Sequence, residues 1–288
     1  MEKAAKADLT FSVGSLAYAR RLSNRLHELH LCAYCQLKID SGMNRSGVRW
    51  REGEEDAAIR AVNQIYALDN LHFTGIYTHM ACPESQLADD IKFTDLQYAR
   101  FSDACTRLEK THELGIRHCL SSGGSLARPE YCMDMIRVGM LIYGQCDSAE
   151  NMKMLELHEA LCWYSYVTQI EILKKGEYVS YGRTFQAPRD MRIGIVSCGY
   201  ADGYRRCYQK TGEVLAAGKR IKVLGRICMD FMIVDLSDIP DAKVGMKVVL
   251  LGEQGGNHIS AIEIAEKNNT TCGEVTLAIT ERVPRIYI

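Results

Sequence analysis

The order of the hydrophobic segments constrains the fold of this chain more than any other feature. Up to about Gly144, short apolar runs of strand length alternate with longer amphipathic segments of helical spacing. This alternation is typical of parallel β/α units. After about Leu155 the apolar runs lie closer together and are separated by Gly and Asp turns, which is typical of a mostly β domain. Two domains are therefore predicted, at residues 1–155 and 156–288.

In the first domain we expect five strands separated by helices. The strands are at residues 9–13, 31–39, 71–79, 118–122 and 137–143, and the helices at 16–26, 54–67, 93–113 and 130–135. The second domain is expected to have strands at residues 164–173, 191–197, 221–224, 228–236 and 247–251, helices at 262–267 and 275–280, and a final strand. A parallel β/α barrel of the TIM type closes with eight strands, so five strands predict an incomplete barrel.

Composition narrows the class of function. The chain has 288 residues, is 47% hydrophobic and carries a formal net charge of −1 with both signs interspersed. No basic footprint for nucleic acid or for a membrane surface is present, so we expect a small-molecule substrate. No apolar run reaches the roughly 18 residues that span a membrane, and the start of the chain lacks the apolar core of a secretion signal. The twelve cysteines are therefore expected to be reduced thiols in the cytoplasm.

Two motifs in the second domain indicate a tyrosine that transfers protons. Val-Ser-Tyr-Gly-Arg-Thr-Phe at residues 179–185 is followed by Gly-Tyr-Ala-Asp-Gly-Tyr-Arg-Arg at residues 199–206. A tyrosine is useful for proton transfer only if positive charge and hydrogen bonds bring its pKa, about 10 when unperturbed, closer to neutrality. Taken alone, the segment around Tyr181 is a strand end that runs into a turn. Together, the two motifs resemble the signature of the alanine racemase family of pyridoxal-phosphate enzymes.

The resemblance covers essentially the whole chain. It implies an isomerase that interconverts L- and D-alanine by two-base proton exchange on a pyridoxal 5′-phosphate aldimine, with Tyr181 as the base on the L face, and that supplies D-amino acids for peptidoglycan. Family members begin with three earlier strands that carry the lysine of the Schiff base, and no Lys-Ala-Asn-Ala-Tyr-Gly-like motif occurs in this sequence. The chain is therefore interpreted as an amino-terminally incomplete racemase that is inactive by itself.

Residues 38–45 match the family pattern Lys-x-Asp-x-Gly-Met-x-Arg and follow a strand, where parallel barrels place active-site groups. The resemblance implies that Arg45 binds the substrate carboxylate and the phenolic oxygen of the cofactor, a task that suits the rigid fork of a guanidinium. Lys38 matches the lysine that is carbamylated in many relatives and orients this arginine. Without the resemblance, both would be solvated charges at a strand end.

Two further segments of the first domain follow strands. Tyr-Thr-His-Met-Ala contains His79, which the resemblance places beside the catalytic tyrosine, where it would hydrogen-bond Tyr181. Ser-Ser-Gly-Gly-Ser contains Ser122, which by resemblance contacts the cofactor phosphate. The family usually has Asn where this chain has Ser121. A satisfied core histidine and a plain turn are the alternatives.

Residues 137–144 match the family's Arg-x-Gly followed by Tyr-Gly. The resemblance puts Arg137 against the pyridine nitrogen of the cofactor, and backbone at Gly139 and Met140 against the phosphate. Because arginine keeps its proton at ordinary pH, the ring nitrogen stays unprotonated, which favours reprotonation of Cα over transamination. A structural ion pair is the alternative role for Arg137.

In the second domain, Gly-Arg-Ile-Cys-Met-Asp at residues 225–230 matches another family motif. It implies that the N–H of Met229 binds the substrate carboxylate and that Asp230 supports it. In the family, residues that match Tyr181 and Met229 reach the cofactor of the partner subunit, so the resemblance implies a homodimer with shared active sites.

Gly273 departs from the family pattern. Aligned through the near-terminal Arg-Val-Pro-Arg, it occupies the place of a tyrosine that touches the phosphate and the substrate methyl group. Its absence leaves space for a hydroxymethyl group, as in the alanine/serine racemases of vancomycin resistance, which are often fused to a membrane domain. Serine is therefore a second expected substrate, and the cytosolic part of a membrane-tethered protein a second expected location. Otherwise Gly273 is only a turn before the last helix.

A rival from another class is a non-catalytic remnant or interaction protein derived from such a racemase, which the absent lysine motif motivates. Decarboxylases of basic amino acids share a barrel and a β domain, but the motifs fit racemases better. No metal site and no nucleic-acid partner are expected.

Overall fold

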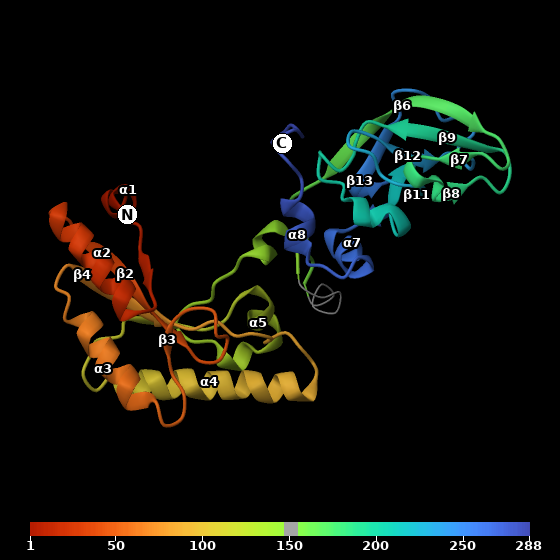
Figure 1. Ribbon diagram of the computed structural model, residues 1–288. Coiled ribbons are helices and arrows are strands. Elements are labelled where there is room, and N and C mark those ends of the chain that lie inside the picture. The colour runs from red at the N-terminus through yellow and green to blue at the C-terminus, as the bar shows by residue number, and fades with distance from the viewer. Residues whose placement is uncertain (147–154) are drawn as a thin grey trace. The chain divides into compact units, whose positions relative to one another are not determined.

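The computed structural model describes residues 1–146 and 155–288. Contacts within the chain define two compact units, Met1–Gly139 and Met140–Ile288, whose helices and strands are drawn in Figure 1. Each unit has its own hydrophobic core. The expected domain bounds, residues 1–155 and 156–288, stay a prediction, since residues 147–154 lie outside the described part of the chain.

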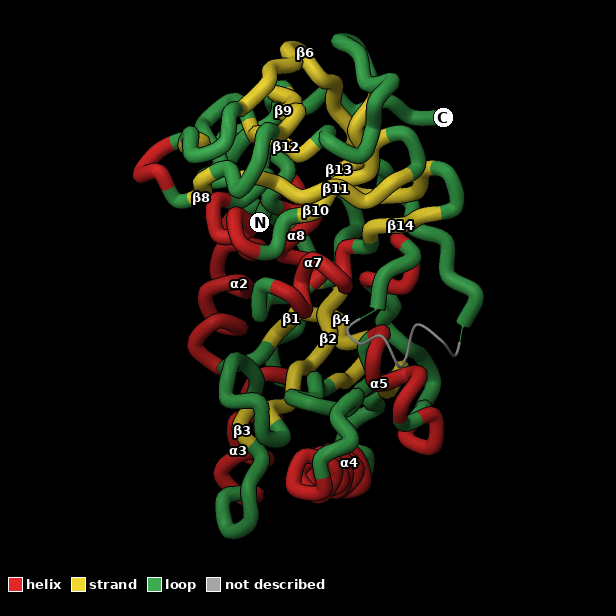
Figure 2. Tube along the Cα trace, turned by 90° about the vertical axis from the view of Figure 1, so that its right-hand side faces the viewer, coloured by secondary structure: helices red, strands yellow, loops and turns green. Residues whose placement is uncertain are grey.

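The first unit is built on a parallel sheet. Its elements are α1 (Glu2–Lys6), β1 (Phe11–Val13), α2 (Leu16–Glu28), β2 (Ala33–Asp40), β3 (Val48–Arg49), α3 (Glu55–Tyr66), β4 (Leu71–Tyr77), α4 (Ala88–Leu108), β5 (Ile116–His118) and α5 (Ser122–Ala127). The strand order is β1-β2-β4-β5, with β3 added parallel to the end of β2. Figure 2 shows β1, β2 and β4 side by side, as their pairing requires.

Alternation along the strands separates the core from the site. In β2 the side chains of Cys35, Leu37 and Ile39 are buried, whereas Gln36 and Lys38 alternate with them and are half-buried. Successive strand residues point to opposite faces, so one face of the sheet is apolar and the other carries polar groups. The apolar core is completed by side chains from α2, α3 and α4, among them Leu22, Leu26, Val62, Ile65, Phe101 and Leu108.

Two expectations for the first half of the chain are wrong. Residues 137–143 form no strand: Arg137 makes an isolated parallel bridge with Ser121, and Met140–Tyr143 is a 3-10 turn with exposed apolar side chains. A short apolar run does not distinguish a strand from a helical turn, which explains the error. The expected helix at residues 130–135 does not form, and only the 3-10 turn Pro129–Tyr131 reaches into this segment. The helix of this region, α5, lies before it and ends at Ala127, because Pro129 disfavours helical geometry at Arg128.

The second unit contains a closed antiparallel sheet of seven strands and a separate two-stranded sheet, in which Tyr178–Val179 pairs with Phe185–Gln186. Its strands are β6 (Trp163–Leu173), β7 (Tyr178–Val179), β8 (Phe185–Gln186), β9 (Met191–Val196), β10 (Glu213–Ala216), β11 (Lys219–Leu224), β12 (Met232–Asp235), β13 (Lys247–Gln254) and β14 (Asn257–Ile259), followed by α7 (Ala261–Lys267) and α8 (Cys272–Leu277). The order is β10-β11-β12-β9-β6-β13-β14, and β10 also pairs with β13, so the sheet closes on itself. Closure removes unpaired edges.

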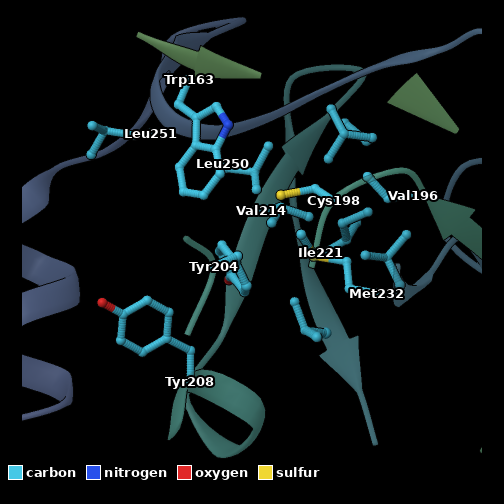
Figure 3. Close-up of a cluster of buried hydrophobic side chains, with 14 of the residues drawn as sticks. Trp163, Val196, Cys198, Tyr204, Tyr208, Val214, Ile221, Met232, Leu250 and Leu251 are labelled. Carbon is cyan, nitrogen blue, oxygen red and sulfur yellow. The ribbon is translucent and has the colours of Figure 1, made fainter. Parts of the chain in front are cut away.

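The core of this sheet holds part of a sequence motif. Tyr204, the second tyrosine of Gly-Tyr-Ala-Asp-Gly-Tyr, is 3% exposed and lies between Trp163 and Tyr208, with ring centroids 6.0 and 5.4 Å away. Figure 3 shows these rings with the surrounding aliphatic side chains. Tyr204 is therefore a core residue that anchors the motif.

Three details of the second half also differ from expectation. Residues 228–231 form a loop, and the strand expected there begins only at Met232. No strand follows α8, because Pro284 lacks an N–H donor and the last residues are exposed. Gly273 lies inside α8 rather than in a turn before it.

Candidate active site

A cavity of about 400 Å³ opens on the polar face of the first unit's sheet. It is lined by Thr10, Phe11, Ser12, Gln36, Lys38, Arg45, Tyr77, His79, His118 and Arg137. Strand register explains the gathering, because Lys38 pairs with Tyr77 and Tyr77 pairs with His118 in one row across β2, β4 and β5. The lining has three cationic side chains and no carboxylate, so the cavity favours an anionic ligand.

Arg137 is the centre of the hydrogen-bond network in this cavity. Its Nη1 donates to Nδ1 of His118 at 2.7 Å, and its Nη2 lies 3.2 Å from Nδ1 of His79. Nη2 also donates to the carbonyl oxygens of Thr78 and Cys119, at 2.8 and 3.4 Å. Because four acceptors hold one planar group, the guanidinium has a fixed orientation.

The two histidines are neutral. Burial, followed by the charge of Arg137, lowers the pKa of His118 to about 4, and the same two causes lower the pKa of His79 to about 4. Nδ1 of His118 accepts from a guanidinium, so its proton is on Nε2, which donates to Oε1 of Gln36 at 3.0 Å. The corresponding bond to Nδ1 of His79 leaves the Nε2–H of that ring available as a donor.

Tyr77 was not identified from the sequence. Its ring stacks on His118 with centroids 5.0 Å apart and an interplanar angle of 1°, and its hydroxyl lies 2.6 Å from Oγ of Ser12. Arg137 lies 5.1 Å from the ring centroid. His118, Gln36 and Ser12 were missed as well, although a polar residue at alternate positions of a parallel strand was a usable signal.

Lys38 and Arg45 are two of the three basic residues that line the cavity. Nζ of Lys38 donates to Oγ of Ser46 at 2.6 Å. Burial lowers the pKa of Lys38, and the charge of Arg45 lowers it further. At a given pH, a larger fraction of Lys38 is therefore in the uncharged amine form than for a solvated lysine.

Ser122 and Gly139 meet outside this row. The N–H of Gly139 donates to Oγ of Ser122 at 2.8 Å, which leaves the hydroxyl hydrogen of Ser122 free to donate. A Cβ on Gly139 would have Oγ of Ser122, at 3.9 Å, as its nearest neighbour, so the space beside Gly139 is open. Met140 belongs to the second unit, and its contact with a phosphate stays a prediction.

In the second unit, Tyr181 lies in a turn between β7 and β8 and is 66% exposed. Three of the surrounding residues, Ser180, Gly182 and Arg183, have positive φ. The turn is held because Oγ of Ser180 donates to the carbonyl of Arg226 at 2.6 Å. Gly182 has a φ of 72°, in the left-handed region that favours glycine, and a Cβ there would lie 2.9 Å from Nη1 of Arg226.

The loop that carries Met229 is bound to the Gly-Tyr-Ala-Asp-Gly motif. The N–H groups of Tyr200 and Ala201 donate to the carbonyls of Cys228 and Met229, both at 3.0 Å. Met229 itself is 53% exposed. The tyrosine turn and the Met229 loop thus share the segment 225–228 as a common support.

Asp230 is tied to the near-terminal Arg-Val-Pro-Arg segment. Nη2 of Arg282 donates to Oδ1 of Asp230 at 2.7 Å, and Nε of Arg282 lies 3.4 Å from Oδ1 of Asp202. Among the described residues, 1–146 and 155–288, a Cβ at Gly273 would have Oγ1 of Thr271, at 3.9 Å, as its one neighbour within 4 Å outside the backbone of its own helix.

Seven of the predicted site residues form two sets, and Ser122, Gly139, Met140 and Gly273 belong to neither. Lys38, Arg45, His79 and Arg137 surround the cavity of the first unit, whereas Tyr181, Met229 and Asp230 share one surface region of the second. The predicted bond between His79 and Tyr181 stays a prediction, and the structure gives His79 a bond to Arg137.

Comparison with known proteins identifies the family. The family model for the N-terminal domain of alanine racemase matches residues 1–147, and that for the C-terminal domain matches residues 160–287. The chain belongs to the alanine racemase family. Its β/α and mostly β units are the two domains of that fold.

Individual relatives agree. The alanine racemase of Desulfosudis oleivorans is 36% identical over 286 residues, which cover 97% of this chain and 73% of the relative. That of Halothermothrix orenii is 34% identical over 98% of this chain and 73% of its own length. Among solved structures, alanine racemase from Clostridium difficile 630 has a TM-score of 0.88 at 30% identity, covering 100% of this chain and 73% of that one. An alanine racemase from Bacillus anthracis with bound L-Ala-P also has a TM-score of 0.88, at 30% identity and with 100% and 72% coverage.

Other features of this racemase family member concern thiols, metals and membranes. None of its twelve cysteines, all within the described ranges, forms a disulfide. Across residues 1–146 and 155–288, no cluster of three or more His, Cys, Asp or Glu side chains is arranged to hold a metal ion. In the same residues, no helix combines the length and apolar character that a membrane crossing requires.

Proposed function

We propose that this chain carries the cofactor cavity and the tyrosine base of a racemase that interconverts L- and D-alanine with pyridoxal 5′-phosphate. One observation carries the proposal: the half-buried guanidinium of Arg137, fixed between two imidazoles with lowered pKa values, faces a cavity lined by cations. An unprotonated pyridine nitrogen accepts a hydrogen bond, and a guanidinium has only hydrogen-bond donors, so the two groups are complementary.

The residues present fit the cofactor. Its phosphate and phenolic oxygens are anionic, and the cavity offers the guanidinium groups of Arg45 and Arg137 without an Asp or Glu carboxylate in its lining. Ser122 has a hydroxyl hydrogen to donate to a phosphate, and Gly139 orients that hydroxyl through its own N–H. We propose that Arg137 holds the pyridine nitrogen and that Ser122, Gly139 and Met140 form the phosphate end.

The chemistry that pyridoxal phosphate supplies when bound is an electron sink for a carbanion at the substrate Cα. Arg137 limits that sink, because a guanidinium does not give its proton to the ring nitrogen. Charge therefore stays near Cα, where the proton returns. This favours racemisation over transamination.

Arg45 is proposed to bind the substrate carboxylate through its planar fork of donors. The lowered pKa of Lys38 supports the proposal that this amine is carbamylated, because only the uncharged amine reacts with carbon dioxide. A carbamate would carry a negative charge and orient Arg45. The N–H of Met229, supported by Asp230, is proposed to bind the other side of the carboxylate.

Tyr181 is proposed to exchange the Cα proton on the L face. Its exposed ring suits a role at the cofactor of a second copy of the chain, and a homodimer with shared sites is proposed on this basis. The Nε2–H of His79, which the bond from Arg137 leaves free, is proposed to donate to the phenolic oxygen of that tyrosine. Such a bond stabilises the phenolate that accepts a proton.

Serine is proposed as a second substrate because the described residues leave open space at Gly273, the position to which the family resemblance assigns a tyrosine. We also propose a cytoplasmic location, which the absence of disulfides among the twelve cysteines supports. The D-alanine formed there would serve peptidoglycan synthesis.

A racemisation assay tests the proposal. The segment that precedes the matched part in the Desulfosudis oleivorans relative, where the family resemblance expects the lysine, is fused before residue 1, and optical rotation of L-alanine is followed with pyridoxal phosphate. The proposal expects conversion toward an equal mixture, lost in Arg137→Ala. A folded fusion protein without activity would instead favour a non-catalytic remnant.

A further inference from the structure

Arg51 and Asp40 form a nearly buried ion pair beside the cavity. Nη2 of Arg51 lies 3.2 Å from Oδ1 of Asp40, and the two side chains are 11% and 9% exposed. Neither residue lines the cavity. Removing one partner of such a pair leaves an unpaired buried charge, so the pair has a strong structural effect on whatever it holds.

The pair holds the loop between β2 and β3. Oδ1 of Asp40 accepts from the N–H groups of Gly42 and Asn44, at 2.9 and 3.1 Å. Arg51 returns to the same loop, since Nη2 donates to Oδ1 of Asn44 at 2.8 Å and Nη1 donates to the carbonyl of Asp40 at 2.5 Å. These bonds form a closed ring around the turn that immediately precedes Arg45.

Backbone conformation makes the loop dependent on this ring. Asn44 has a φ of 54°, in the left-handed region that a non-glycine residue seldom adopts. Arg51 follows Trp50, whose side chain is 1% exposed. Nε1 of Trp50 donates to Oδ2 of Asp103 at 3.0 Å, which fixes the backbone next to Arg51. The ring therefore connects the rigid body of the unit to the residue next to Arg45.

We propose that Arg51 is a positioning residue for carboxylate recognition, acting through Asn44 and Asp40 on the orientation of Arg45. The inference rests on the proposed function, in which Arg45 binds the substrate carboxylate. An arginine is required because it serves three acceptors of one loop in fixed directions, which a lysine ammonium on a flexible stem does not. The guanidinium is also bound to the neighbouring residue, since Nη1 of Arg51 donates to the carbonyl oxygen of Trp50 at 2.7 Å.

The test compares two probes on the whole 288-residue chain. Pyridoxamine 5′-phosphate has the phosphate and ring but no carboxylate. N-phosphopyridoxyl-L-alanine, the stable amine conjugate, adds the alanine carboxylate, and neither probe needs a lysine linkage. Calorimetric dissociation constants give the ratio between the probes, which isolates carboxylate recognition from general stability of the cavity.

Arg51→Gln is expected to reduce the preference for the conjugate by about ten-fold or more, while the affinity for pyridoxamine phosphate changes less than about two-fold. Arg51→Lys is expected to recover only part of the preference. Asn44→Ala, which leaves the buried ion pair intact, should cause a smaller loss in the same direction and serves if Arg51→Gln does not fold. Arg49→Gln is the matched control, because Arg49 is two positions away and pairs with Glu54 on the surface.

The outcomes separate this inference from the proposed function. The positioning role is overturned if the ratio of the two dissociation constants is unchanged in both Arg51→Gln and Asn44→Ala, whether or not the two probes are weakened equally. Arg45→Gln should remove the preference altogether, and a preference that survives it contradicts the proposed role of Arg45 and the inference with it. Failure of the wild-type chain to bind either probe contradicts the proposed cofactor cavity itself and also overturns the inference.

Discussion

Nη1 of Arg137 donates a hydrogen bond of 2.7 Å to Nδ1 of His118, and this contact requires the histidine to be neutral. Stability should therefore depend on pH. The pKa of His118 falls from 6.5 to about 4 on folding. The unfolded chain binds the proton more readily, so the contribution is complete above pH 6.5 and is lost as the pH falls from about 6.5 to about 4.

Urea denaturation between pH 7.5 and 4 checks this prediction. For the buried His118 the loss of unfolding free energy is on the order of 3 kcal/mol. His118→Gln should remove about half of the histidine-dependent loss, because His79 has a pKa lowered to about 4 as well and still titrates, and His72→Gln, which changes an exposed imidazole on β4, should leave the loss unchanged. Identical slopes in all three proteins would show that His118 is not the titrating group.

Local sequence predicted the regular parts of the fold. β2, α2 and β4 have clear periodicity, and their predicted positions are close to the observed ones. The segments at residues 137–143 and 228–231 failed for a physical reason: apolar side chains such as Ile142, Tyr143, Met229 and Phe231 are exposed there. Apolar spacing predicts burial, and these side chains are not buried.

Site residues that belong to a sequence motif were predicted, and those that reach the cavity only through the pairing register of the strands were missed. Lys38, Arg45, His79 and Arg137 belong to recognisable motifs, and all four line one cavity. Tyr77 and His118 reach it because they pair across β4 and β5, which no local pattern specifies. The bonds of Arg282 to Asp230 also join segments far apart in sequence.

Arg282→Gln should loosen the Met229 loop with little effect on global stability, because the Asp230 pair is largely exposed. Hydrogen exchange is expected to accelerate at the amides of Tyr200 and Ala201, which bond to that loop. Lys174→Gln, which breaks an exposed pair with Asp190, is the control. Unchanged exchange at both amides would mean that Arg282 does not support the loop.

Gly273→Tyr should lower serine turnover relative to alanine by about ten- to a hundred-fold in the active fusion protein, because the ring fills the space beside the substrate side chain. The ratio of specificity constants for L-serine and L-alanine measures this. Gly273→Ala strengthens the helix without filling the space and should leave the ratio unchanged. If tyrosine also leaves it unchanged, substrate choice lies elsewhere.

The 288-residue chain by itself should show no racemase activity, because no segment of it matches the family's lysine motif. Borohydride treatment with pyridoxal phosphate, followed by peptide mapping, should find no stoichiometric labelling, including at Lys38 in the cavity. Robust turnover, or full labelling of one cavity lysine, would refute this prediction.

Exchange of the Cα proton with deuterated water tests the central claim most directly. In the fusion protein, both L- and D-alanine should lose their Cα proton. Tyr181→Phe removes one hydroxyl and little volume, so exchange from L-alanine should fall by about a hundred-fold or more, while exchange from D-alanine within the first turnover persists. Equal, undiminished exchange from both enantiomers would remove Tyr181 from the mechanism and contradict the account.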